Sequence, residues 1–203
     1  MTGIIDYGVG NLFSLKCSFA AISEEVTVTG DPAKIAKFDR ILLPGVGAYE
    51  DAAKKLHESG LGECVKAEAA KGKPLLGICL GMQLLFDRSF EYGEHEGLGL
   101  IPGDIRPIAD IAPKGLKIPH MGWNGLFFRG EKHPLFKYIK EGDCMYFVHS
   151  YYAVTDPEYI TAEVEYGAFI TASAAKGNVM GCQFHPEKSG DAGLNILRSF
   201  CEM

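Results

Sequence analysis

The sequence predicts an α/β fold in which a doubly wound, mostly parallel sheet carries an antiparallel β extension in the C-terminal half. Two observations predict it. In the first half of the chain, short apolar or β-branched runs alternate with runs whose apolar residues recur at helical spacing, as in a parallel sheet covered by helices on both faces. From about residue 104 to residue 186, short β-rich segments separated by turns replace that alternation.

Each expected element of the first half follows from its residues. Residues 3–7 form a short apolar strand, and Leu12, Leu15 and Phe19 recur at helical spacing within residues 12–22. The other expected strands are residues 25–29, 40–43 and 74–78, and the other expected helices are residues 32–37, 48–57, 61–71 and 80–86. This alternation predicts a flavodoxin-like arrangement of the parallel strands.

The second half is predicted to consist mostly of strands. They are residues 104–107, 116–119, 124–128, 145–154, 161–166, 170–174 and 179–184, followed by a final helix over residues 192–201. Lys176, Gly177 and Asn178 are typical of a hairpin turn between the last two strands. No repeat, low-complexity tract or linker divides the chain, so residues 1–203 are expected to form a single domain.

The composition argues against several classes of protein. A formal net charge of -6 and a pI of about 5.5 disfavour nucleic-acid binding, which calls for a basic face. The most apolar stretches, residues 40–47 and 74–86, are shorter than the roughly 20 residues of a membrane span. The chain starts without the pattern of a secretory signal. Its six cysteines are therefore expected to be reduced thiols of a cytoplasmic protein.

A glycine-rich turn raises the question of a cofactor. Residues 8–13 follow a strand and open a helix, but Phe13 stands where a dinucleotide-binding turn needs glycine or alanine. The chain also lacks a G-x-x-x-x-G-K-[ST] phosphate-binding loop, and no two cysteines form a C-x-x-C pair. Neither a nucleotide nor a metal cofactor is expected.

The strongest local motif is Gly77-Ile78-Cys79-Leu80-Gly81. It has the G-x-nucleophile-x-G form of a nucleophile elbow, with cysteine in place of serine, between an apolar strand and a helix. Glycines on both sides remove the Cβ clashes that so sharp a turn would create. The side chain of Cys79 is then expected to project from the carboxyl edge of the sheet, where ligands bind in such folds. The alternative is a buried cysteine in a glycine-containing turn.

A thiol nucleophile needs a base, and the base needs a group that orients it. His120, His149 and His185 are the candidate bases, and His185 is favoured because Pro186 and Glu187 follow it. Proline biases the preceding residue towards extended backbone, in which side chains two apart point the same way. Glu187 is thus predicted to accept a hydrogen bond from His185, as the acid of a triad does. The alternative is a strand-end histidine with an incidental acidic neighbour.

Five stretches, spread in order over nearly the whole chain, carry a family resemblance. They are residues 6–12, 43–48, 77–86, 119–124 and 183–189. With them the chain resembles the class I, triad-type glutamine amidotransferases, and among these the glutaminase subunits that serve a cyclase in histidine biosynthesis. The resemblance implies a triad of Cys79, His185 and Glu187 that hydrolyses the side-chain amide of glutamine to glutamate and ammonia through a cysteinyl thioester.

The resemblance also implies roles for residues around the nucleophile. The tetrahedral oxyanion would be bound by the backbone N–H of Leu80 and by a second N–H from the loop that contains Val46 and Gly47. Glycine on both sides of Val46 would let that peptide flip. The residues implied for binding glutamine come from three segments of the chain: Gln83, Glu91, Ser150 and Tyr151.

Ammonia is mostly protonated in neutral water, so a glutaminase needs an acceptor site close by, and no motif of this chain provides one. A partner is therefore expected. The resemblance implies a heterodimer with a cyclase subunit of (β/α)8-barrel form, which receives ammonia through its interior. The products would be imidazole glycerol phosphate and aminoimidazole carboxamide ribotide. The residues implied at the interface are Asn11, Trp123, Tyr146 and Lys188.

Three other interpretations are weighed against this one. A stand-alone hydrolase such as a γ-glutamyl peptidase would use the same triad but would not need the motif at residues 119–124. The glutaminase of pyridoxal phosphate synthase has a different glycine-rich sequence where this chain has residues 44–47. A catalytically dead binding subunit would have no need of an intact Cys79, His185 and Glu187.

Overall fold

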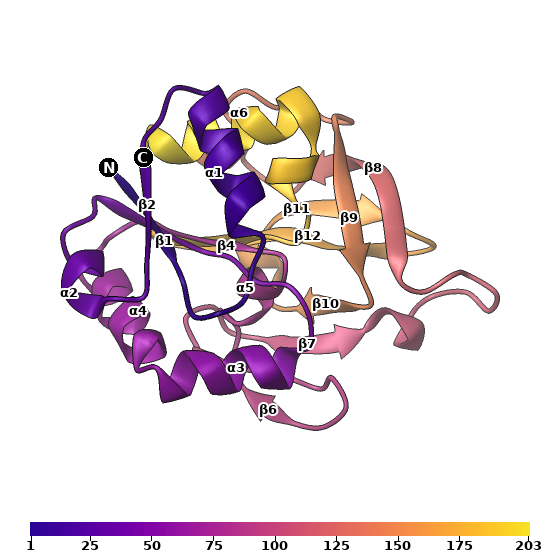
Figure 1. Cartoon of the computed structure of the whole chain (residues 1–203). Coiled ribbons are helices and arrows are strands. Elements are labelled where there is room, and N and C mark those ends of the chain that lie inside the picture. The colour runs from indigo at the N-terminus through magenta and orange to yellow at the C-terminus, as the bar shows by residue number, and fades with distance from the viewer.

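A nine-stranded mixed sheet runs through the computed structural model, which describes residues 1–203 (Figure 1). The strand order is β2-β1-β3-β4-β13-β12-β11-β8-β9. The parallel strands are β1 (Thr2–Ile5), β2 (Val26–Thr29), β3 (Arg40–Leu43), β4 (Leu75–Ile78) and β13 (Val179–Cys182). The antiparallel strands are β8 (His120–Phe128), β9 (Cys144–His149), β11 (Ile160–Glu165) and β12 (Phe169–Lys176). The predicted α/β class, with its parallel core and antiparallel extension, is confirmed.

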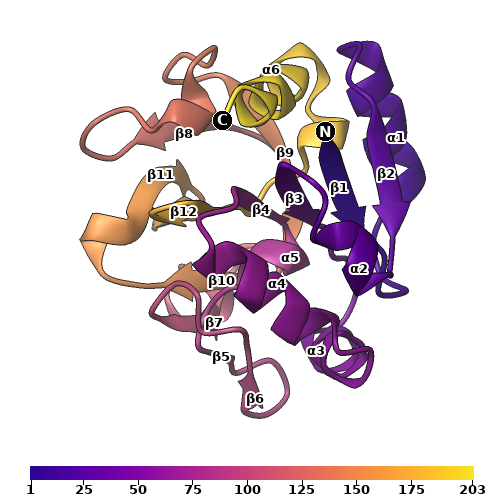
Figure 2. The same ribbon diagram turned by 90° about the vertical axis from the view of Figure 1, so that its left-hand side faces the viewer.

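Helices cover the parallel part of the sheet on both faces (Figures 1 and 2). One face carries α1 (Leu12–Ala21) and α6 (Gly190–Cys201), and the other carries α2 (Pro32–Ile35), α3 (Tyr49–Glu58) and α4 (Leu61–Ala70). Their apolar side chains fall into two hydrophobic clusters, one with Phe19 and Phe200, the other with Ile35, Leu56 and Val65. The two clusters are the two layers that a doubly wound sheet requires.

A second, smaller sheet adjoins the α3 side of the molecule and was not predicted. It has the order β10-β7-β5-β6 and contains β5 (Arg88–Ser89), β6 (His95–Glu96), β7 (Asp104–Pro107) and β10 (Tyr151–Val154). The predicted single strand over residues 145–154 is therefore wrong, because the chain leaves the large sheet at Ser150 and enters the small one. Four short 3-10 helices complete the chain: Ile108–Asp110, Pro134–Phe136, Pro157–Tyr159 and Pro186–Lys188.

Three further predicted elements differ from the structure by more than two residues. The strand expected over residues 124–128 begins earlier, at His120, as part of β8. The helix expected over residues 80–86 ends early, as α5 (Leu80–Gln83). The N–H groups of Leu85 and Phe86 donate to carbonyls only three residues back, and Asp87 N–H donates to the carbonyl of Gly103. The strand expected over residues 116–119 is an irregular loop, which follows a turn closed by the hydrogen bond from Leu116 N–H to the carbonyl of Pro113. No helix in the structure combines the length and the apolar character that a bilayer crossing demands.

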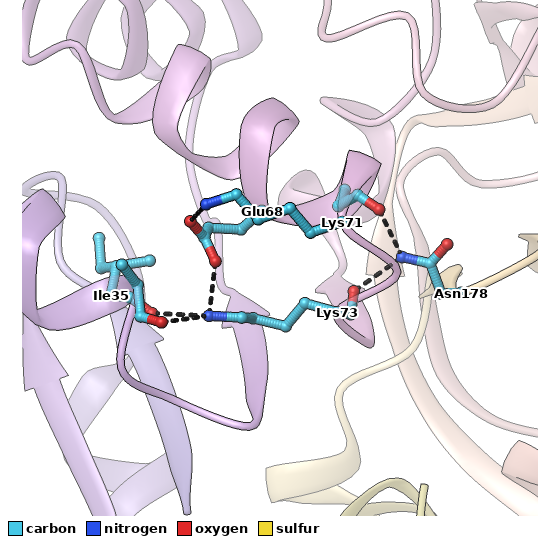
Figure 3. Close-up of polar contacts among 7 residues, drawn as sticks. Ile35, Glu68, Lys71, Lys73 and Asn178 are labelled. Carbon is cyan, nitrogen blue, oxygen red and sulfur yellow. Dashed lines mark hydrogen bonds and ion pairs between the residues drawn. The ribbon is translucent and has the colours of Figure 1, made fainter.

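Lys73 connects α2, α4 and the turn between β12 and β13 (Figure 3). Its ammonium donates to the carbonyls of Ile35 (3.1 Å) and Ala36 (3.0 Å) at the end of α2, and it pairs with Glu68 of α4 at 2.7 Å. The carbonyl of Lys73 accepts from the side-chain amide of Asn178 at 2.8 Å. Asn178 lies in the predicted β12–β13 hairpin turn, which is confirmed, so this network fastens the hairpin to the start of β4.

Replacing Glu68 by glutamine is expected to lower the free energy of unfolding by about 1–3 kcal/mol near neutral pH. Hydrogen bonds from Lys71 (2.6 Å) and from Lys73 hold the pKa of the buried Glu68 carboxyl below its usual value. A carboxylate with a lowered folded-state pKa stabilises the protein above its unfolded pKa of about 4.3, and that contribution is lost as the pH falls through the folded value. Urea unfolding of both proteins should therefore give a smaller difference in acid.

The matched control is Glu63→Gln in the same helix. Glu63 pairs with Lys66 at 3.0 Å, but both side chains are exposed, and exposed pairs contribute little, so a loss below about 0.5 kcal/mol is expected. Equal losses for Glu63→Gln and Glu68→Gln, or a Glu68→Gln loss that does not change with pH, would contradict the stabilising role of the Glu68 carboxylate.

Candidate active site

The chain turns sharply at Cys79, between β4 and α5. Cys79 has φ of 53° and ψ of -111°, a backbone conformation that L-residues rarely adopt. A Cβ on Gly77 would lie 2.7 Å from the carbonyl oxygen of Gly81, and a Cβ on Gly81 would lie 2.0 Å from the carbonyl oxygen of Leu43. Glycine is therefore required on both sides of the turn, which directs the thiol outward from the carboxyl end of β4.

The sheet brings a distant part of the sequence beside this turn. β13 pairs with β4 in parallel, and Cys79 N–H donates to the carbonyl of Cys182 at 2.8 Å. The chain leaving β13 therefore passes next to the thiol, and it carries Gln183, His185 and Glu187. The neighbouring strands, rather than any local sequence motif, thus determine which side chains meet Cys79.

His185 and Glu187 are in direct contact. The distance from Nδ1 of His185 to Oε1 of Glu187 is 2.8 Å, and each side chain is only 2% exposed. The predicted extended backbone is wrong beyond His185, because residues Pro186–Lys188 form a 3-10 turn, which brings the carboxylate under the imidazole. The backbone of His185 is held to β9, since its N–H donates to the carbonyl of Tyr146 at 2.9 Å.

The environment of His185 favours its charged form. Burial by itself favours the neutral imidazole, but hydrogen bonds and charge interactions with Cys79 and Glu187 outweigh it and raise the pKa of His185 to about 10. Glu187 adds to this effect because its Oε2 is buried without a hydrogen-bond partner. The charged imidazole is therefore the main group that stabilises the buried negative charge of Glu187. The structure thus brings Cys79 close to His185, and His185 into contact with Glu187.

A cavity of about 450 Å³ opens over Cys79. The residues around it that sequence analysis singled out are Val46, Gly47, Cys79, Leu80, Gln83, Glu91, Ser150, Tyr151, His185 and Lys188. They come from five separate segments of the chain, and the structure gathers them around one opening. Glu187 lies behind His185 and not on the cavity wall.

The glycine-rich loop after β3 packs against the elbow. A Cβ on Gly45 would lie 2.6 Å from the backbone nitrogen of Gly81, so only glycine allows the loop to approach α5 so closely. Gly47 has φ of 95°, a conformation that favours glycine, and the side chain of Val46 between them is 41% exposed. The loop therefore presents the peptides around Val46 to the cavity beside Leu80.

Glu91 and Gln83 occupy different walls of the cavity. The carboxylate of Glu91 accepts a hydrogen bond from the backbone N–H of Tyr49 at 2.9 Å, at the start of α3. Burial raises the pKa of Glu91 above its usual value. The side-chain nitrogen of Gln83 lies 3.2 Å from the carbonyl of Tyr151, so α5 is tied to the first residue of β10.

Three of the four residues assigned to an interface lie together. Trp123 of β8 is paired with Tyr146 of β9, and their rings meet edge-on with centroids 5.9 Å apart. The ammonium of Lys188 lies 5.6 Å from the centre of the Tyr146 ring. Trp123 is 55% exposed, and Met121 on the same strand is 61% exposed. The fourth residue, Asn11, caps α1, where its side chain accepts from Ser14 N–H at 3.4 Å.

Two buried histidines, His120 and His149, have roles that the sequence does not predict. Nδ1 of His120 lies 3.0 Å from Nε2 of His149, and Nδ1 of His149 lies 2.8 Å from the carbonyl of Tyr151. Burial lowers the pKa of His149 to about 3, so it is neutral. His120 and His149 are therefore parts of the cavity wall and its support rather than alternatives to His185 as base. Only the β8–β9 pairing brings them together, so no local pattern announces the contact.

Comparison with known proteins agrees with this geometry. The family model described as glutamine amidotransferase class-I matches residues 3–203. The imidazole glycerol phosphate synthase subunit HisH of Caldanaerobacter subterraneus is 48% identical over 204 residues, which cover 100% of this chain and 98% of that protein. The subunit of the same description from Sulfurimonas denitrificans is 48% identical, covering 98% of this chain and 97% of that protein.

Solved structures share the fold at lower identity. A crystal structure of a glutamine amidotransferase superposes with a TM-score of 0.77 at 19% identity, covering 99% of this chain and 97% of that one. The structure of PurLQS from Thermotoga maritima gives a TM-score of 0.76 at 19% identity, with the same coverage. The chain therefore belongs to the class I glutamine amidotransferase family, in the group of the HisH glutaminase subunits of imidazole glycerol phosphate synthase.

Proposed function

We propose that Cys79 is the nucleophile, His185 the general acid and base, and Glu187 the orienting acid of the glutaminase reaction. The chain hydrolyses the side-chain amide of glutamine and supplies ammonia for imidazole glycerol phosphate synthesis in histidine biosynthesis. The observation that carries the residue assignment is the arrangement of three groups. A thiol on a strained turn and an imidazole with a raised pKa line one cavity, and a buried carboxylate lies 2.8 Å from Nδ1 of that imidazole.

In the first half of the reaction, the sulfur of Cys79 attacks the amide carbon of glutamine. The electron pair of the C=O bond moves to oxygen, and the backbone N–H groups of Leu80 and of the loop at Val46 and Gly47 stabilise the oxyanion. The oxyanion then collapses, the C–N bond breaks, and His185 transfers its Nε2 proton to the departing nitrogen. Ammonia leaves, and a thioester remains on the sulfur.

In the second half, water hydrolyses the thioester. Neutral His185 accepts a proton from water as its oxygen attacks the carbonyl carbon, and the C–S bond breaks with its electron pair on sulfur. Glutamate leaves, and the charged imidazole and thiolate are restored. Glu187 stabilises the imidazolium in both halves through its contact with Nδ1. Gln83, Glu91 and the backbone of Ser150 and Tyr151 bind the substrate, with the Glu91 carboxylate at its amino group.

Covalent labelling tests the assignment of the nucleophile. A diazo-ketone analogue of glutamine is expected to add one label per chain, at Cys79, and glutamine should protect against it. The six cysteines are all free, so peptide mapping compares Cys79 with internal controls, of which the exposed Cys17 and Cys144 are the most accessible. Labelling of another cysteine, with Cys79 left unlabelled in an active preparation, would overturn the mechanism. The free thiols also support the proposal that the protein works in the reducing cytoplasm.

The curated relatives are subunits of a synthase, so this chain works with a partner subunit. We infer that the partner is a cyclase of (β/α)8-barrel form that forms a heterodimer with it and accepts ammonia through its interior. The exposed pair Trp123 and Met121, next to Tyr146 and to the cavity residue Lys188, supports this site of contact. Asn11 is proposed as a further contact, because α1 packs against the turn that carries Lys188.

Binding of the purified cyclase tests this surface. Trp123→Ala is expected to weaken binding by about tenfold or more, since buried tryptophans dominate such interfaces. The matched control is Phe127→Ala, because Phe127 is an exposed aromatic further along the same strand and lies outside the proposed contact. Wild-type affinity for Trp123→Ala, or an equal loss for both variants, would contradict the placement of the partner. The cyclase and its nucleotide substrate should also raise the rate of glutamine hydrolysis, if the partner controls the peptide at Val46 that supplies the second oxyanion donor. Only a marginal increase would rule out such control by the partner.

A further inference from the structure

The chain contains only two glutamines, Gln83 and Gln183, and they are in contact beside the nucleophile. Nε2 of Gln83 lies 2.9 Å from Oε1 of Gln183, and the two residues are 5% and 0% exposed. Nε2 of Gln183 lies 3.6 Å from Sγ of Cys79. Buried side-chain polar atoms nearly always have a hydrogen-bond partner, and here the two amides are partners of each other. The mechanism above gives Gln183 no role.

The carbonyl of Tyr151 determines the orientation of the Gln183 amide, through Gln83. The carbonyl of Tyr151 can only accept hydrogen bonds, so the Gln83 atom that faces it at 3.2 Å must be the amide nitrogen. That nitrogen also faces Gln183, where only an oxygen can accept from it. The NH2 group of Gln183 is therefore directed at Cys79, and not its carbonyl oxygen.

The carbonyl of Tyr151 is itself held in place. It accepts a second hydrogen bond from Nδ1–H of His149 at 2.8 Å. With that proton on Nδ1, the neutral ring has an acceptor at Nε2, which faces Nδ1 of His120 at 3.0 Å. His120 is fully buried and stacked between Phe147 and Tyr166. The acceptor that fixes the direction of both glutamine amides is thus anchored by β8 and β9.

The backbone fixes the distance between the amide and the sulfur. Gln183 directly follows β13, where the carbonyl of Cys182 accepts from Cys79 N–H at 2.8 Å. On its other side, Gln183 N–H donates to the carbonyl of Ala172 at 2.8 Å. Gln183 and Cys79 are therefore held by neighbouring strands of one sheet, and little freedom remains for the amide to turn away from the sulfur.

We propose that Gln183 is a catalytic residue whose amide N–H donates to the sulfur of Cys79 and stabilises it as a thiolate, with Gln83 holding the amide in that direction. The proposal rests on Cys79 being the nucleophile. A hydrogen bond is strongest when its acceptor is charged. In the proposed mechanism the sulfur is charged before it attacks, and again when the C–S bond of the thioester breaks and leaves its electron pair on sulfur. Gln183 thus assists the release of glutamate as well as the first attack.

Gln183→Met removes the donor at similar volume and tests the proposal. The rate at which iodoacetamide alkylates Cys79, measured by peptide mapping as a function of pH, is expected to fall about tenfold in the acid range. Its midpoint should rise by about one pH unit, and the rate should approach that of the wild type at high pH. Gln183→Glu, which puts a carboxylate near the sulfur, should shift the midpoint in the same direction and further. A midpoint equal to the wild type in Gln183→Met would overturn the proposal.

The matched control separates a direct effect from loss of stability. Ser173 is buried in the adjacent strand β12 and donates to the carbonyl of Gly181 at 2.7 Å, so Ser173→Ala should destabilise the sheet and leave the alkylation midpoint unchanged. Different results would overturn the proposal that Cys79 is the nucleophile and the proposal that Gln183 donates to it. Absence of labelling of Cys79 by the diazo-ketone would overturn the mechanism, whereas labelling and turnover with an unshifted midpoint in Gln183→Met would overturn only the role of Gln183.

The hydrogen bond from Gln183 to Cys79 can also be tested in the wild-type protein, without any variant that must fold. Selective 15N labelling of glutamine gives side-chain amide signals from two residues only, Gln83 and Gln183. The Gln183 signals are expected to shift as the pH passes through the ionisation of Cys79, and to shift again when Cys79 is alkylated. The Gln83 signals should respond less, because they lie one contact further away. Amide signals that ignore both changes would show that Gln183 does not donate to the sulfur.

Discussion

Replacing His185 by alanine is expected to lower kcat/KM for glutamine hydrolysis by about 10³-fold or more. The variant keeps the strained turn at Cys79, but it loses both the proton for the departing ammonia and the positive charge beside the sulfur. The loss should appear in kcat rather than KM, since His185 acts on the reacting atoms. Steady-state release of glutamate, with and without the cyclase, measures it. Activity within tenfold of the wild type would show that another group transfers the proton.

Glu187→Gln is expected to change the pH dependence of the same reaction. The pKa of His185 is about 10 because burial, which lowers it, is outweighed by Cys79 and Glu187, so removal of the Glu187 charge is expected to lower that pKa. The imidazolium is the proton donor, and activity disappears as the pH rises through its pKa. The alkaline limb of the kcat/KM profile should therefore move to lower pH in Glu187→Gln. An unmoved limb would exclude Glu187 from the control of His185.

Replacing Gly81 by alanine is expected to remove at least about 3 kcal/mol of stability, or to prevent folding. The added Cβ would lie 2.0 Å from the carbonyl oxygen of Leu43 and 3.1 Å from the carbonyl carbon of Pro44. These are backbone atoms of a buried strand and of the glycine-rich loop, so neither can move without separating the loop from the elbow. Urea unfolding measures the loss, and any folded protein should have lost glutamine hydrolysis as well.

The control for Gly81→Ala is Gly8→Ala. Gly8 has φ of 82° and no atom near the position of a Cβ, so the substitution adds strain of roughly 1 kcal/mol without a clash. Gly81 lies in α5 and is not among the glycines of positive φ, so its loss should come from the clash alone and exceed that of Gly8→Ala. A loss at Gly81 no larger than the loss at Gly8 would contradict the close approach of the loop to α5 as the reason for glycine at this position.

The parts of the fold that sequence analysis predicted correctly are those set by local periodicity. Residues 40–43 form β3 with the expected bounds, and the turn after Lys176 is the expected hairpin. The nucleophile elbow is visible in the sequence because Gly77 and Gly81 are required by contacts within or next to one βα unit. The contact of His185 with Glu187 is also local, although a 3-10 turn and not an extended segment produces it.

The features that sequence analysis missed depend on contacts between distant segments. An apolar run such as residues 145–154 does not reveal that it changes sheets at Ser150, because both halves have strand-like residues. The helix after Cys79 is not continued beyond residue 86, because Asp87 N–H donates to the carbonyl of Gly103 in a later loop. Gln183 lies within a stretch that identifies the family, but its contact with the thiol exists only once β13 lies beside β4.

The central position of β13 in the sheet has a consequence for biosynthesis. Gln183 and Cys79 are 104 residues apart, and the ribosome adds about 5–20 residues per second. The thiol therefore emerges roughly 5–20 s before the segment that completes its surroundings, and during that interval β4 is an unprotected edge of a nascent sheet. A growing chain cannot release ammonia until translation is nearly finished, and fragments that stop short of Val179 should be prone to aggregate rather than weakly active.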